Sequence, residues 1–143
     1  MFDQEGVTDH IIELEQAIID WNRYQQVSLE DLKTDRDKRN MVLHALLVSI
    51  QAALDIANHI IAAQKLARPS TYRESFDILA EAKFLPSKLA NQLADLAGFR
   101  NVLVHIYWRL DMELVYNILQ NDLDTIVEFI RVVKTKIKEE TQE

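Results

Sequence analysis

The stretch LHALLVSIQAALDIANHII, Leu43 to Ile61, decides the fold class of this chain. Its apolar residues recur at intervals of three and four, which is the period of one face of an α-helix. Upstream, Ser28 can cap a helix, and Asp31 lies where negative charge favours the positive end of the helix. The pattern therefore predicts one long helix over residues 29–65, ending before Arg68-Pro69-Ser70.

Four more amphipathic segments surround this helix. The apolar periodicity predicts helices over residues 7–25 and 72–82, a third from Pro86 through Leu103, and a fourth from Asp111 through Ile137. Thr71 with Glu74 forms the sequence pattern of a capping box, and Asp111 can cap the last helix.

Turn residues are scarce, since the whole chain of 143 residues has two glycines and two prolines. Strand-rich folds need frequent turns, so this scarcity favours long helices. No repeat, linker or low-complexity segment divides the chain. We therefore predict one domain over residues 1–143: an all-α, mostly antiparallel bundle of about five helices.

Composition excludes several functional classes. The chain has no cysteine, which excludes disulfides and thiolate chemistry and fits a reducing compartment. It has no apolar run of the roughly 18 residues that a transmembrane helix requires, and its acidic start lacks the pattern of a secretory signal. We therefore expect a cytoplasmic protein that does not associate with a membrane.

The net charge of −7 disfavours nucleic-acid binding at first sight. However, six of the 23 acidic residues fall in the first 20 positions, which have no lysine or arginine. The rest of the chain thus has 17 acidic against 16 basic residues, a net of −1. Most of the negative charge therefore lies in the first 20 residues. This segment is either a solvated helix surface or a docking face for a basic partner.

Polar residues that could take part in a reaction interrupt the apolar run FRNVLVHIYW, Phe99 to Trp108. Arg100, Asn101, His105 and Tyr107 are the candidates. On a helix that turns by about 100° per residue, Asn101 and His105 share a face, whereas Arg100 and His105 lie about 140° apart. Arg100 and His105 can therefore meet within one chain only if the helix ends or bends near His105. The alternative is that each meets other groups across an interface between two copies of the chain.

This set of residues suits a phosphodiester. Arginine presents a planar, permanently charged fork that matches phosphate oxygens, and histidine can take or give a proton near neutral pH. Asparagine can orient either group, and no metal is needed. By spacing alone, the alternative is an ordinary ion pair at Arg100 and a hydrogen-bonded structural histidine at His105.

Asp55 and His59 form a second polar pair in the predicted long helix. Their i,i+4 spacing lets them touch, and it also suits two metal ligands, but no further carboxylate–histidine pattern completes a metal site. A structural polar pair is the simpler interpretation, and a place in the lining of a cleft is the alternative for Asp55.

With these residues in view, RNVLVHIY resembles the Arg-polar-x-x-x-His signature of the HEPN superfamily, in the Arg-x-x-x-x-His-x-Tyr form of its HepT branch. HepT proteins are ribonuclease toxins paired with minimal nucleotidyltransferase (MntA-like) antitoxins. Two upstream stretches, DIANHII (Asp55–Ile61) and PSTYRESFDIL (Pro69–Leu79), are also similar to that branch, so the resemblance covers most of the chain.

The resemblance implies a helical homodimer, or a higher complex, in which the motifs of two subunits line one cleft. It implies metal-independent cleavage of RNA, with the ribose 2′-hydroxyl attacking the neighbouring phosphate and no cofactor. His105 would be the general base or acid, Arg100 would stabilise the phosphate charge, and Asn101 would position the site. Asp55 would line the cleft.

The resemblance also implies control by a partner. The tyrosine of the motif, here Tyr107, would accept AMP from the antitoxin, which would silence the toxin of a type VII-like toxin–antitoxin pair. The alternative function, favoured by the acidic charge, is a non-catalytic HEPN subunit that binds nucleotide or docks a nucleotidyltransferase.

Overall fold

A computed structural model describes the backbone of residues 4–105 and 109–142 and the side chains of residues 6–104 and 109–140. In these ranges the chain is all helical, as predicted. Its helices are α1 (Gln4–Tyr24), α2 (Leu29–Thr34), α3 (Arg36–Ala63), α4 (Tyr72–Glu81), α5 (Ser87–His105), α6 (Met112–Asn121) and α7 (Leu123–Gln142).

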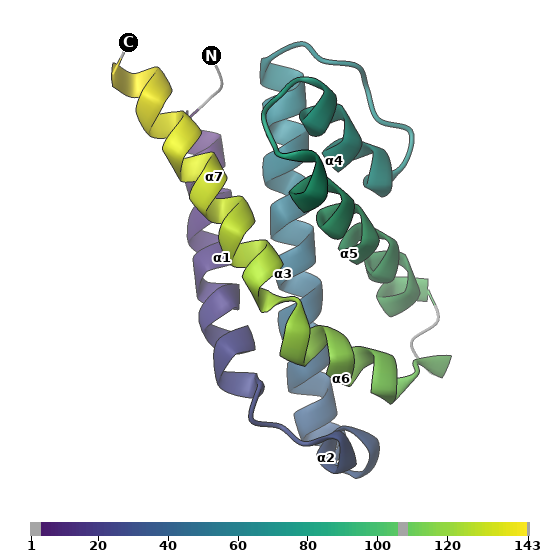
Figure 1. The fold of residues 1–143 in the computed structure, drawn as a ribbon. Coiled ribbons are helices and arrows are strands. Elements are labelled where there is room, and N and C mark those ends of the chain that lie inside the picture. The colour runs from purple at the N-terminus through teal and green to yellow at the C-terminus, as the bar shows by residue number, and fades with distance from the viewer. Residues whose placement is uncertain (1–3, 106–108, 143) are drawn as a thin grey trace.

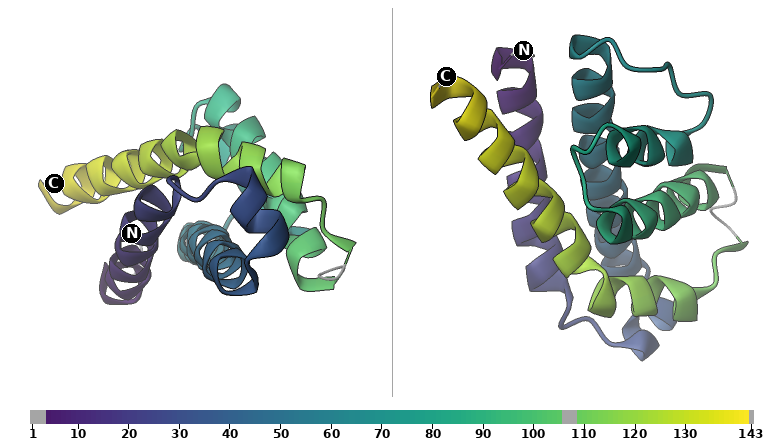
Figure 2. Two further views of the ribbon diagram at one scale, coloured as in Figure 1. Left: turned by 90° about the horizontal axis from the view of Figure 1, so that it is seen from below. Right: turned by 45° about the horizontal axis from the view of Figure 1, so that its top comes forward.

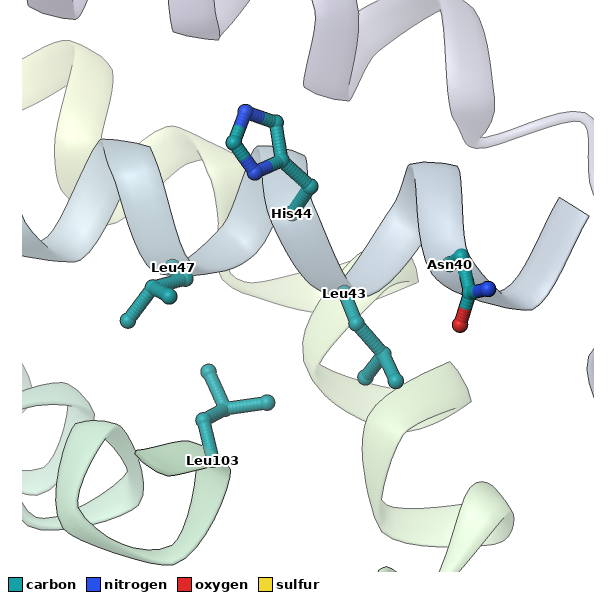
Figure 3. Close-up of a pocket in the computed structure, with 5 residues that line it drawn as sticks. All are labelled: Asn40, Leu43, His44, Leu47 and Leu103. Carbon is teal, nitrogen blue, oxygen red and sulfur yellow. The ribbon is translucent and has the colours of Figure 1, made fainter. Parts of the chain in front are cut away.

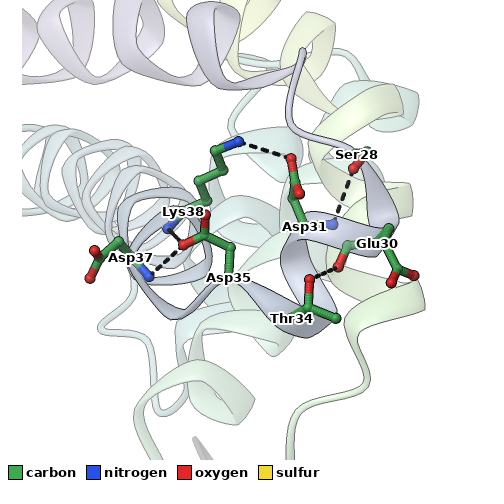
Figure 4. A network of polar contacts seen from close by, with 7 residues as sticks. All are labelled: Ser28, Glu30, Asp31, Thr34, Asp35, Asp37 and Lys38. Atoms are coloured by element: carbon green, nitrogen blue, oxygen red, sulfur yellow. Dashed lines mark hydrogen bonds and ion pairs between the residues drawn. The ribbon is translucent and has the colours of Figure 1, made fainter.

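Two of the five predicted helices are each divided in two. The predicted helix over residues 29–65 breaks at Asp35, whose backbone is extended (φ −103°, ψ 103°) and whose carboxylate accepts hydrogen bonds from the N–H groups of Asp37 and Lys38. Asp35 thus ends α2 and caps α3, and the ammonium of Lys38 reaches back across the corner to Asp31 at 3.0 Å (Figure 4). The predicted last helix is likewise interrupted at Asp122, between α6 and α7.

The caps predicted from the sequence are present. Ser28 accepts from the N–H of Asp31, Thr71 from that of Glu74, and Asp111 from that of Glu113. Two helices that lack a glycine at their end, α3 and α4, close with a left-handed residue: Lys65 (φ 56°) and Lys83 (φ 65°). Backbone bonds from Leu66 to Ile61 and from Phe84 to Leu79 complete these turns, so helices can end here with little glycine in the chain.

The long helix α3 forms the centre of the bundle. α1 runs antiparallel to it, α7 crosses both, and α4 and α5 pack on the opposite flank of α3 (Figures 1 and 2). Trp21 of α1 is fully buried and donates through Nε1 to the carbonyl of Leu119 at 2.8 Å, which ties α1 to α6. This arrangement directs one side of α3 toward α5, the helix that carries Arg100.

α3 is also the one helix among the described residues that is long and apolar enough to cross a bilayer by length and composition. In the bundle, however, 61% of its apolar window is buried. A central core helix meets the same criteria, and the packing of α1, α4 and α5 accounts for its composition. Met41 is the large apolar residue of α3 that stays exposed, so little apolar surface of this helix is left over for a partner.

Candidate functional site

Arg100 lies in the second half of α5 and points toward α3 and α4. Its Nε donates a hydrogen bond of 2.8 Å to the side-chain oxygen of Gln51 on α3. The guanidinium carbon also lies 4.5 Å from the centre of the Tyr72 ring, at the start of α4. Arg100 is half-buried, so both contacts act in a partly desolvated setting where a cation over an aromatic ring is worth about 1–2 kcal/mol.

Gln51 connects Arg100 to a second charged group. Its amide nitrogen donates to Asp55 Oδ1 at 2.9 Å, one helical turn further along α3. The other oxygen of Asp55 lies 4.0 Å from Nδ1 of His10 on α1. A row of polar side chains therefore runs from α5 across α3 to α1, and its outer end is open to solvent because the side chains of Asp55 and His10 are 39% and 41% exposed.

The partners of Asp55 differ from the one predicted from the sequence. Among the described residues it pairs with Gln51 and His10, not with His59, so the predicted Asp55–His59 pairing is wrong. Asn58 instead links α3 to α4, since its side-chain oxygen accepts from the hydroxyl of Ser75 at 2.7 Å. In residues 6–104 and 109–140, no group of three or more His, Cys, Asp or Glu side chains is arranged to hold a metal ion.

Arg73 fixes the position of Tyr72 relative to Arg100. It reaches from α4 to α5, where Nη1 donates to the carbonyl of Ala94 at 3.0 Å and Nη2 to Asp95 at 3.2 Å. Gly98 of α5 leaves room for this side chain, because a Cβ there would lie 3.1 Å from Nη1 of Arg73. The glycine thus leaves room for Arg73 to connect α4 to α5 at Ala94 and Asp95, before Arg100.

The other motif residues continue to the end of α5. Asn101 is exposed beside Arg100, and the described part of α5 runs as far as His105. The side chain of His105 and the whole of Tyr107 lie outside the described residues. The predicted grouping of Arg100, Asn101, His105 and Tyr107 into one site therefore stays a prediction.

An apolar hollow of about 370 Å³ adjoins the end of α5. Leu103, two residues before His105, faces α3 across it, and Asn40, Leu43, His44 and Leu47 complete its lining (Figure 3). Val104 is 43% exposed at the same end of α5, next to His105. The end of the helix that carries the motif thus presents apolar surface as well as polar groups.

Two residues that contact Arg100, Gln51 and Tyr72, were not identified as site residues from the sequence. A signal for Gln51 does exist, because it stands alone as an uncharged amide in the apolar run ALLVSIQAALDIA, one helical turn before Asp55. Nothing in the sequence pairs Tyr72 with Arg100, since that contact depends on how α4 packs against α5.

The helical bundle agrees with the relatives of the chain. A family model described as Ribonuclease HepT-like matches residues 14–133, which is well over half of the sequence. The chain belongs to this HepT-like family, and its fold is that of the HEPN proteins.

Curated relatives and a solved structure extend the comparison. The chain is 34% identical to the mRNA nuclease HepT of Shewanella oneidensis over 80% of this chain and 87% of that protein. It is 28% identical to the tRNA nuclease HepT of Aphanizomenon flos-aquae over 79% and 77% of the two chains. The tri-AMPylated HEPN toxin of S. oneidensis, solved in complex with its MNT antitoxin, superimposes with a TM-score of 0.81 at 29% identity, covering 90% of this chain and 96% of that one.

Proposed function

We propose that this protein is the ribonuclease toxin of a type VII-like toxin–antitoxin pair, an endonuclease that cleaves RNA without a metal ion. The observation that carries the proposal is the arrangement of Arg100, which Gln51 and Tyr72 hold near the end of α5 in a chain of the HepT-like family. Two related chains of similar length are an mRNA nuclease and a tRNA nuclease, which supports RNA as the substrate class.

The chemistry needs a charge stabiliser and a proton carrier. A base removes the proton of a ribose 2′-hydroxyl, and the 2′-oxygen then forms a bond to the adjacent phosphorus. The bond from phosphorus to the 5′-oxygen breaks, and an acid gives that oxygen a proton, which leaves a 2′,3′-cyclic phosphate and a 5′-hydroxyl. Arg100 neutralises the negative charge on the phosphate oxygens, and His105 transfers the protons.

A second copy of the chain would complete the site. One histidine is needed as a base and one as an acid in the same turnover, and two His105 side chains in a two-fold cleft can divide these roles. The exposed Val104 next to His105 supports an interface at this end of α5. In this arrangement Asn101 orients the scissile phosphate from the exposed face of α5, and Asp55 lines the cleft beside Gln51.

Control would come from a partner nucleotidyltransferase of the MntA type. In our proposal it transfers AMP to Tyr107, and the added phosphate charge and nucleotide bulk, two residues from His105, compete with RNA for the cleft. The structural neighbour from S. oneidensis, an AMPylated toxin bound to its antitoxin, supports this part of the proposal. Both partners and the RNA substrate would meet in the cytoplasm.

Replacing Arg100 by lysine tests the role of the guanidinium. Lysine keeps the positive charge but lacks the planar fork, the Nε donor to Gln51 and the guanidinium carbon that lies over the Tyr72 ring. We expect Arg100→Lys to cleave labelled RNA roughly 10- to 100-fold more slowly than the wild type, the range for one lost charge-assisted contact in the transition state.

Arg131→Lys provides the matched control, because Arg131 is an exposed arginine of α7 whose charge pairs with Glu128. This variant should cleave at the wild-type rate. A cleavage rate of Arg100→Lys equal to that of Arg131→Lys would remove Arg100 from the proposed mechanism.

A further inference from the structure

Gln51 has hydrogen-bonding partners that leave its side-chain amide one possible orientation. The Nε of Arg100 can only donate, and an ionised Asp55 carboxylate can only accept. The amide oxygen of Gln51 must therefore face Arg100, and its NH₂ group must face Asp55, as the distances of 2.8 Å and 2.9 Å show. Glutamine is the side chain of this length that can satisfy both neighbours at once.

These contacts restrict the guanidinium in two independent ways. The bond from Nε to Gln51 lies in the plane of the guanidinium and fixes its direction, while the ring of Tyr72, whose centre is 4.5 Å from the guanidinium carbon, adds a cation–π contact. Arginine has five N–H donors, so the bond at Nε leaves the four donors of the two terminal nitrogens for a phosphate. Half-buried Gln51 thus holds the base of the guanidinium without using its terminal nitrogens.

We propose that Gln51 is the positioning residue of the site, and that Asp55 acts by holding the Gln51 amide in the orientation that Arg100 requires. This inference rests on the proposed ribonuclease function. It gives Asp55 a specific role, which is to accept a hydrogen bond within the protein rather than to touch RNA. His10 lies 4.0 Å from Asp55, too far for a directional hydrogen bond, so it does not set the orientation of the carboxylate.

Gln51→Met is the first test, because methionine has nearly the same length and shape but can neither accept from Arg100 nor donate to Asp55. We expect the single-turnover rate of RNA cleavage at saturating RNA to fall roughly tenfold, with a much smaller change in the RNA concentration needed for half-saturation. The melting temperature should change little. The control is Gln92→Met, at an exposed position of α5, which should cleave at the wild-type rate.

A polarity swap separates positioning from packing. Gln51→Glu alone keeps an acceptor for Arg100 but sets two carboxylates against each other, so it should also be slow. The double variant Gln51→Glu/Asp55→Asn restores both hydrogen bonds, since the amide at position 55 then donates to the carboxylate at position 51, and the net charge is unchanged. We expect it to recover cleavage to within about threefold of the wild type, an interaction that a double-mutant cycle measures directly.

A measurement on the free protein supplies a readout apart from cleavage. The Nε–H signal of Arg100 in a ¹⁵N correlation spectrum, identified by its loss in Arg100→Lys, should exchange with water slowly in the wild type and in the double variant and fast in Gln51→Met.

Two outcomes distinguish a failure of this inference from a failure of the ribonuclease function on which it rests. RNA cleavage by the wild type, with Gln51→Met within twofold of it, would overturn the positioning role of Gln51 and leave the ribonuclease intact. No cleavage by the unmodified wild type would overturn the ribonuclease, and with it any catalytic purpose of the Arg100–Gln51 contact.

Discussion

Replacing His105 by alanine is expected to lower the rate of RNA cleavage by roughly 10²- to 10⁴-fold, the contribution typical of a positioned general acid or base. In a two-fold cleft one substitution removes both the base and the acid, so the upper part of that range is expected. Because the change removes one polar group and opens no cavity in the core, it should leave the helix content and the melting temperature almost unaltered. Single-turnover cleavage of a labelled RNA, together with a thermal melt and a measured molecular mass in solution, checks all three expectations.

His105→Gln is the matched variant for this experiment. Glutamine preserves the size and polarity of the position but cannot exchange a proton near neutral pH, so it should be as slow as His105→Ala. If either variant cleaved RNA within twofold of the wild type while Arg100→Lys was impaired, the proton carrier would have to be another residue.

Replacing Tyr107 by phenylalanine should reduce AMP incorporation to background. In the proposed modification the phenol oxygen attacks the α-phosphate of ATP and pyrophosphate leaves, so removing one oxygen atom removes the nucleophile. The ring is kept, and RNA cleavage by the variant should therefore continue even after incubation with ATP and the partner nucleotidyltransferase. The intact mass of each sample, recorded before the cleavage assay, reports the number of AMP groups.

Tyr116→Phe, at a half-buried position of α6, is the control and should accept AMP as the wild type does. Undiminished incorporation in Tyr107→Phe would place the acceptor at another residue. If Tyr107→Phe took up no AMP but was still inhibited by the nucleotidyltransferase, AMP transfer would not be what controls the nuclease.

The sequence predicted helices and caps better than it predicted breaks. Ser28, Thr71 and Asp111 stand at the boundary between a polar segment and an apolar stripe, so both the cap and the start of the helix are visible in the sequence. Asp122 instead interrupts a stripe whose apolar residues continue on both sides, so periodicity alone joined α6 to α7. Asp35 lies in the polar run of residues 33–40, which the sequence also allows as the solvated start of one long helix, and α2 was therefore joined to α3.

The candidate site was predictable only where its residues are close in sequence. Arg100 and Asn101 belong to one short motif, and their types suggest phosphate chemistry without any knowledge of the fold. Gln51 and Tyr72 join Arg100 from helices 49 and 28 positions earlier in the chain, and those contacts arise from the packing of α5 on α3 and α4. Gln51 can be recognised afterwards as a solitary amide in an apolar run, whereas Tyr72 carries no such signal.

The partners of Asp55 illustrate the same limit. The i,i+4 rule was applied to Asp55 and His59 only, although Gln51 lies four residues before Asp55 and is an equally placed neighbour. In the bundle the carboxylate accepts from Gln51 because that amide also serves Arg100. Arg100, on α5, thus determines which of its neighbours on α3 Asp55 pairs with.

Cleavage of labelled RNA in the presence of EDTA tests the central claim most directly, with protein whose intact mass shows that it carries no AMP. The proposal predicts that the wild type cuts RNA internally, leaves 2′,3′-cyclic phosphate and 5′-hydroxyl ends, and is unaffected by the chelator. Failure of this unmodified protein to cut any of several mRNA and tRNA substrates would contradict it, and would favour a non-catalytic HEPN subunit that docks a nucleotidyltransferase.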